Sequence, residues 1–96
     1  MSVPPRFLHV AFNWQGAPKE TELRPLFDTA LDWAHYAPNC WILWSTTEIE
    51  TWVSYLKKHM GPSDSVVICE VNLSTANKTY SGLADKWVWT WVQKKR

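Results

Sequence analysis

The densest apolar run of the chain, DWAHYAPNCWILW from Asp32 to Trp44, places the strongest constraint on how it folds. Apolar side chains alternate along both halves of this run, and Pro38-Asn39 between them has the composition of a turn. Period-two alternation on both sides of a turn is typical of two paired antiparallel strands. We therefore predict a β-hairpin here, which the other elements must cover.

A helical pattern precedes the hairpin. Apolar residues recur at steps of three and four from a start at Thr21 or Glu22, which would place Pro25 in the first turn, where proline is tolerated. The stripe could continue to Ala34, so the junction with the hairpin is uncertain by several residues.

A second helical pattern follows the hairpin. Thr47 and Glu50 have the spacing of a capping box, in which each side chain satisfies a backbone N–H at the start of a helix. An apolar face then runs from Ile49 to Met60, and Gly61-Pro62 ends the helix.

Two further strands complete the predicted fold, one over Arg6–Phe12 and one over Ser65–Leu73. The order is then β, α, β-hairpin, α, β. Two right-handed crossovers joined by a hairpin bring both helices onto one face of a four-stranded antiparallel sheet, an α+β arrangement of ferredoxin-like βαββαβ type. With 96 residues, the chain is expected to form a single domain over 1–96.

The Trp-rich C-terminal segment fits two structures. Trp87, Trp89 and Trp91 alternate with β-branched residues, as in a strand, but apolar residues from Leu83 to Val92 also fall at helical spacing. Eight Trp residues are more than so small a core needs, so some are expected at a dimer interface or a partner surface.

Composition excludes several classes. The net charge of +1 gives no overall field for wrapping nucleic acid or a membrane, and no apolar run reaches the roughly twenty residues of a membrane helix. We expect a soluble, cytoplasmic protein. Cys40 and Cys69 lie in strand-like apolar runs without metal-site spacing, so we predict free buried thiols and neither a metal nor a cofactor.

The titratable residues suggest structural roles. His9 and His35 lie in predicted strands, and His59 is placed to act as a cation at a helix C-terminus. Asp64 is interpreted as a turn residue before a strand, and Asp28 and Asp32 would pair only if the fold brought them together. No catalytic residue is assigned.

The C-terminal segment is the most suggestive candidate for binding. Aromatic rings followed by cations can stack on bases and neutralise phosphates, or form a hot spot for a protein. The alternative is that the rings pack on the sheet or on a dimer mate while the charged end is solvated. The candidate interface residues are Trp87, Trp89, Trp91 and Tyr80, and the candidate basic contacts are Lys78, Lys94, Lys95 and Arg96.

Several segments resemble one family. The strand end Phe12-Asn13, the segment DWAHY from Asp32, the strand CWIL from Cys40 and the segment SDSVV from Ser63 resemble the SinR-like proteins. These belong with the small CRISPR-associated endoribonuclease type, a dimeric subunit that partners the CRISPR integrase. The resemblance covers roughly residues 6–73 and implies a homodimer in which the last strand and C-terminal segment pack on the partner subunit.

The same resemblance implies a departure from nuclease chemistry. In that family, an Asp at the end of the first strand is the proposed metal ligand, and here Asn13 stands at the matching position. A neutral amide cannot replace a carboxylate pair that holds Mg²⁺. We therefore expect a non-enzymatic homodimer that binds a partner protein, as an inhibitor or accessory factor in phage or bacterial defence. The alternatives are a protein that binds a nucleotide or nucleic acid, and a nuclease with relocated metal ligands.

Overall fold

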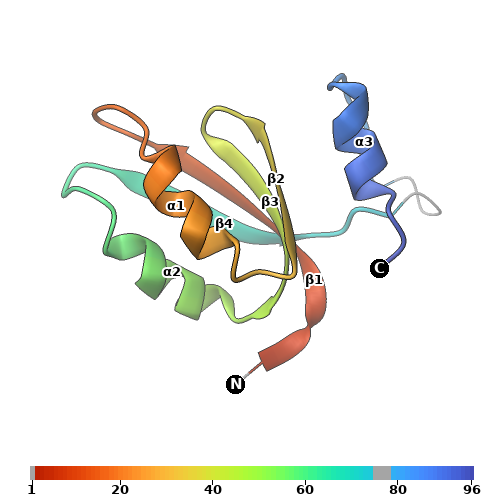
Figure 1. The fold of residues 1–96 in the computed structure, drawn as a ribbon, viewed down its shortest axis with the longest axis horizontal. Helices are drawn as coiled ribbons and strands as arrows, with labels where there is room; N and C mark the ends of the chain where they lie inside the picture. Colours follow the sequence, from red (N-terminus) through yellow and green to blue (C-terminus); the bar gives the residue numbers. More distant parts are fainter. Residues whose placement is uncertain (1, 75–78) are drawn as a thin grey trace.

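The computed structural model describes residues 2–74 and 79–96, which form an α+β fold with a four-stranded antiparallel sheet and three helices (Figure 1). The sheet order is β2-β3-β1-β4, so that β2 and β4 lie at its edges. This arrangement is compatible with the expected ferredoxin-like fold, with a third helix added after the last strand. The elements are β1 (Ser2–Asn13), α1 (Glu20–Phe27), β2 (Asp32–Ala37), β3 (Cys40–Thr47), α2 (Ile49–Lys57), β4 (Ser65–Val71) and α3 (Lys86–Val92).

Helices α1 and α2 lie side by side and cover one face of the sheet (Figure 1). Alternation decides which residues face them: Leu8, Val10 and Phe12 of β1 point to the helices, as do Trp41 and Leu43 of β3. The helices contribute residues at a spacing of four, namely Leu23 and Phe27 from α1 and Trp52 and Leu56 from α2. The predicted hairpin and the apolar faces of both helices are therefore confirmed.

The start of β1 shows how prolines are accommodated in a sheet. The register with β3 shifts between Ser2 and Arg6, across Pro4 and Pro5, which have no N–H to donate. The Arg6 guanidinium replaces the missing donors, since its Nη1 donates to the carbonyl oxygens of Ser45 at 2.8 Å and Thr47 at 2.7 Å. The strand thus extends beyond the predicted Arg6–Phe12 at both ends.

Two predictions about helix starts are wrong. Helix α1 begins at Glu20, one or two residues early, so Pro25 lies in its second turn, and the Thr21 carbonyl loses its usual donor there. The capping box at Thr47 does not form, because Thr47 still pairs with Ser2 as the last residue of β3. Glu48 is the N-cap of α2, and its side chain makes no capping hydrogen bond.

The prediction of buried thiols is also wrong. Both cysteines are free, but Cys40 is half-buried and Cys69 is exposed. Cys69 belongs to edge strand β4 and points away from α1 and α2, since its register partner His9 alternates with Leu8 and Val10. An apolar strand sequence therefore did not guarantee burial on both faces.

The C-terminal ambiguity is resolved in favour of a helix, α3, which stands apart from α1 and α2 (Figure 1). Within residues 2–74 and 79–96, no helix is long and apolar enough to cross a membrane. The candidate basic residue Lys78 lies outside the described residues.

Candidate binding surface

Helix α3 packs on the sheet face that α1 and α2 leave open. Its residues Val88 and Val92, one turn apart, are buried, and they lie on the same side as the half-buried Trp91. The Trp91 ring packs at 5.8 Å on Phe7, which alternates with Leu8 and so faces away from the main core. The helix therefore uses one side to dock on the sheet and leaves its opposite side available.

Arg96 fastens the end of this segment to the sheet. Its guanidinium donates to Asp32 Oδ2 at 3.1 Å and to the Trp91 carbonyl oxygen at 2.7 Å. The same cation lies 4.5 Å from the centroid of the Trp91 ring, with the Phe7 and Trp44 rings at 5.3 and 5.5 Å. Since the Arg96 side chain is only 10% exposed, its charge serves this internal contact and is not offered to a ligand.

Asp32 is the anion at the centre of this contact. Burial by itself would raise the pKa of its carboxyl, but hydrogen bonds from Lys94 Nζ at 3.2 Å, from Arg96 and from the Trp33 backbone N–H lower it overall. The Trp91 indole N–H adds to this lowering, although its nitrogen is buried and reaches no acceptor in hydrogen-bonding geometry. Asp32 therefore remains a carboxylate that joins β2 to the C-terminal segment.

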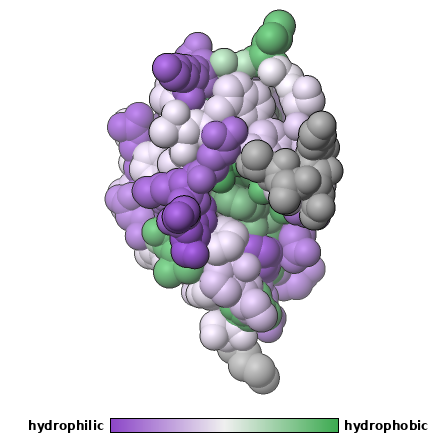
Figure 2. All heavy atoms as spheres, turned by 90° about the vertical axis from the view of Figure 1, so that its right-hand side faces the viewer, coloured by the Kyte–Doolittle hydropathy of each residue, from purple (hydrophilic) through white to green (hydrophobic). Residues whose placement is uncertain are grey.

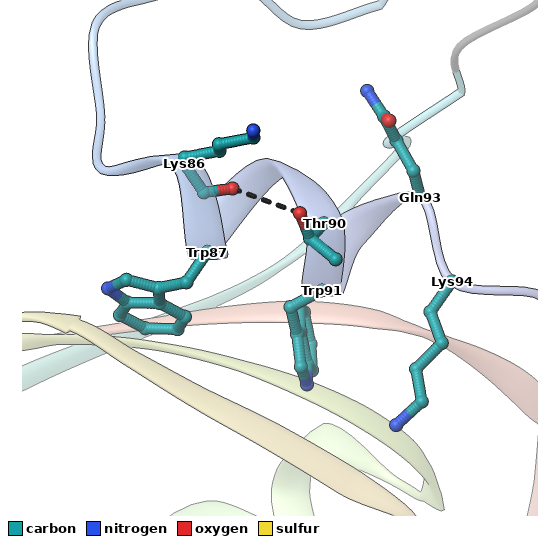
Figure 3. A pocket seen from close by; sticks show the side chains of 6 residues that line it. All are labelled: Lys86, Trp87, Thr90, Trp91, Gln93 and Lys94. Carbon is teal, nitrogen blue, oxygen red and sulfur yellow. Dashed lines mark hydrogen bonds between the residues drawn. The ribbon is translucent and has the colours of Figure 1, made fainter.

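One flank of α3, which we call the Trp87 flank, carries a more exposed set of residues beside Trp91. A shallow concavity of about 890 Å³ is lined by Lys86, Trp87, Thr90, Trp91, Gln93 and Lys94 (Figure 3). Figure 3 shows Trp87 and Trp91 projecting from the same side of the helix, with Lys94 extending alongside Trp91. Trp87 is 46% exposed, whereas Trp91 is held against the sheet. The surface thus offers one large ring and two flexible cations.

The segment before α3 packs on the other flank of the helix. Tyr80 stacks on Trp89 with 5.4 Å between ring centroids and 17° between ring planes, and Leu83 is fully exposed. Seen from the side of the molecule that carries α3, hydrophobic residues lie between hydrophilic ones (Figure 2). The four aromatic residues proposed for binding therefore lie on two flanks of α3, and only Trp87 presents much of its ring to solvent.

The remaining predicted residues have structural surroundings. His35 stacks on Trp41 at 3.9 Å between ring centroids, and His59 lies 3.6 Å from a carboxylate oxygen of Glu22. Asp64 accepts hydrogen bonds from the backbone N–H groups of Gln15 and Gly61, both at 2.8 Å, and these bonds lower the pKa of its carboxyl. Asp64 is therefore the turn residue that was predicted.

Asp28 and Asp32 do not form a carboxylate pair. Asp28 Oδ1 accepts from the Trp33 indole N–H at 2.8 Å, whereas Asp32 faces Lys94 and Arg96. Asn13 is exposed at the end of β1, opposite Ser65. Within the described residues, no group of three or more His, Cys, Asp or Glu side chains is placed to hold a metal ion.

Sequence reasoning missed the roles of Asp32 and Phe7. Both residues lie far from Arg96 in the chain, so no local pattern joins them to it. The signals visible in the sequence were the basic residues at the C-terminus and Phe7, an aromatic residue on the opposite side of its strand from Leu8.

Comparison of the chain with protein-family models, with curated proteins and with solved structures finds no match.

Proposed function

We propose that the protein is a non-enzymatic binding protein that holds an acidic partner protein at the Trp87 flank of α3. The observation that carries this proposal is Trp87, an exposed ring between Lys86 and Lys94 on a helix that Trp91 and Arg96 fasten to the sheet. An aromatic residue on a rigid support loses little conformational entropy when it is covered, which is the property of interface hot spots.

Charge favours a partner with carboxylates around an apolar centre. Lys86 and Lys94 are exposed beside Trp87, and the Asp32 carboxylate that Lys94 contacts is already shared with Arg96. Opposite charges at the rim of an interface steer association and select the partner. In the defence setting that the SinR-like resemblance implies, such a protein would act as an inhibitor or accessory factor.

The test compares two exposed aromatic residues. Trp87→Ala should weaken partner binding by at least about 30-fold, a loss of about 2 kcal/mol that is typical of a hot spot, while Tyr55→Ala on α2 should change it less than about twofold. A partner isolated from host lysate is measured by calorimetry against both variants. Equal binding by the Trp87→Ala variant and the unaltered protein would place the interface elsewhere.

Binding of single-stranded nucleic acid is the second candidate, since Trp87 beside Lys86 can stack on a base next to a phosphate. The two candidates differ in their salt dependence. Three phosphate contacts would give a slope of log K against log salt near −2, using about −0.7 per phosphate for single strands. Quenching of Trp fluorescence by an oligonucleotide, lost in Trp87→Ala, would favour this candidate.

We also propose that the protein is a homodimer, formed by pairing of the two β4 edges. Strand β4 is at the edge of the sheet, and its Val67 is 65% exposed beside Cys69. An exposed edge strand without Lys or Pro is a template for pairing with another strand. Val67→Lys should shift sedimentation equilibrium towards the monomer, and an unaltered protein that sediments as a monomer would refute the dimer.

A further inference from the structure

A cavity of about 570 Å³ lies beneath α3, on the flank that carries Val88, Trp89 and Val92, and shares no lining residue with the Trp87 flank. Its floor is the second face of the sheet, with Ile42 of β3 and Val71 of β4. Its roof is the irregular segment 80–85 and the inner residues Val88 and Val92 of α3. This volume falls within the range of about 300–1,000 Å³ that small-molecule sites occupy.

The polar feature of the floor is a pair of side chains from β1 and β2, the two strands on either side of β3. His9 Nε2 and the Tyr36 hydroxyl are hydrogen-bonded at 2.5 Å, and both line the cavity. Burial lowers the pKa of His9. Burial, and then the adjacent Cys40 thiol, raises the pKa of Tyr36 to about 12. At neutral pH both side chains of the pair are therefore uncharged. The hydroxyl and the imidazole can still form hydrogen bonds with a ligand.

The rest of the lining offers little to a charged group. Asp85, at the rim, is the only Asp, Glu, Lys or Arg among the described residues that line the cavity. An anionic ligand would meet no Lys or Arg among these described residues, and a charged group left unpaired in an apolar site is strongly disfavoured. The walls instead provide aromatic and aliphatic surface, including Trp89, which is stacked on Tyr80.

The roof has a shape that depends on glycine. Gly82 has φ of 149°, a backbone conformation that other residues rarely adopt, and it lies in the segment that covers the cavity. Tyr80 connects this segment to α3, through the stacked Trp89 and through the Gln93 side chain, whose Nε2 donates to the Tyr80 hydroxyl at 3.4 Å. The roof is thus joined to the helix that closes the cavity.

We propose that this cavity binds an uncharged, largely aromatic small molecule that exchanges one hydrogen bond with the His9 and Tyr36 pair. The cavity shares no lining residue with the Trp87 flank, so its binding can be measured without the macromolecular partner proposed above. Apolar walls supply the affinity, and the single polar pair orients the ligand.

The probe for this proposal is N-phenyl-1-naphthylamine, a neutral aromatic amine that fluoresces when it leaves water. We expect saturable binding to the protein of residues 1–96. Binding of the anionic analogue 1-anilinonaphthalene-8-sulfonate should be at least about tenfold weaker, because no Lys or Arg stands among the described residues that line the cavity. Absence of saturable binding of the neutral probe, or equal binding of the two probes, would overturn the proposal.

Two variants locate the binding site. Val71→Trp, which fills the cavity from the floor, should weaken binding by at least about tenfold, whereas Val67→Trp, on the same face of the same strand but outside the cavity, should not change it. Undiminished binding by a folded Val71→Trp variant would place the probe elsewhere and refute the assignment.

The polar pair is tested by a conservative change that keeps the ring. Tyr36→Phe should weaken binding of the amine by about 3- to 10-fold, the effect of one hydrogen bond, and leave unchanged the binding of 1-phenylnaphthalene, which has no polar group. This comparison remains decisive if Val71→Trp does not fold. Equal losses for both molecules would mean that the pair does not recognise the ligand.

Discussion

Replacing Arg96 with alanine should release α3 from the sheet while the main core stays folded. The substitution removes two hydrogen bonds, of which the one to the Asp32 carboxylate joins two charged groups, and the stacking of the guanidinium on Trp91. A hydrogen bond that involves charged groups contributes about 1.5–3 kcal/mol, and a cation over an aromatic ring about 0.5–1 kcal/mol. Because Lys94 still pairs with Asp32 after the change, we expect a net loss of about 2–3 kcal/mol from the docking of α3.

Amide hydrogen exchange measures this loss directly. A change of 2–3 kcal/mol corresponds to an increase of about 30- to 150-fold in the opening equilibrium of α3, read as faster exchange of the amides of residues such as Val92 and Gln93. The amides of α2 belong to the core on the opposite face and should keep their protection. Lys95→Ala is the matched control, because Lys95 is exposed and forms no ion pair or hydrogen bond with the described part of the chain.

The reasoning fails if α3 exchanges less than about threefold faster in Arg96→Ala, because the cation would then contribute no more than an ordinary surface ion pair. It also fails if the amides of α2 and α3 lose protection equally. In that case the two faces of the sheet would unfold as one unit, and α3 could not open separately.

Three other predictions follow from contacts of single residues. Ser45→Ala should lower the free energy of unfolding in urea by about 1–3 kcal/mol, because the buried Trp52 indole N–H loses its acceptor at 3.0 Å, whereas the exposed Ser54→Ala should have little effect. The pKa of Asp32 is lowered in the folded state, so its contribution to α3 docking should be present above the usual value of 3.8 and lost as the pH falls below it; Asp32→Asn should abolish this pH dependence. The pKa of Tyr36 is raised to about 12, so its contribution to stability should be lost as the pH rises from 10 towards 12, and an absorbance titration should show a late phenol step that Tyr36→Phe lacks.

Local periodicity was sufficient to predict the sheet and its two covering helices. Alternation in the run from Asp32 to Trp44 and the three- and four-residue steps around Trp52 each fit only one kind of element. In α3 the same rule did not decide, because alternating Trp and Val suit a strand as well as a helix. There the burial of Val88 and Val92 against the sheet, a tertiary contact, determines the outcome.

The residue types at the candidate site could be predicted from the sequence, but the role of each residue could not. The sequence identified the aromatic and basic character of the segment around Trp87, but it assigned Arg96 to a ligand contact, and the structure gives that cation an internal partner in Asp32. The pairing spans most of the chain and depends on the sheet bringing β2 beside the C-terminal segment. No spacing rule within one element can express such a contact.

The docking of α3 and the availability of Trp87 are physically linked. Helix α3 has seven residues, and an isolated helix shorter than about 12–15 residues is marginal in water, so its ordered face depends on contact with the sheet. A partner that recognises this ordered face binds with an apparent Kd equal to the intrinsic Kd divided by the docked fraction. Arg96 on one side and a ligand in the cavity on the other would both raise that fraction. Two sites on different flanks of one short helix would therefore strengthen each other without sharing a residue.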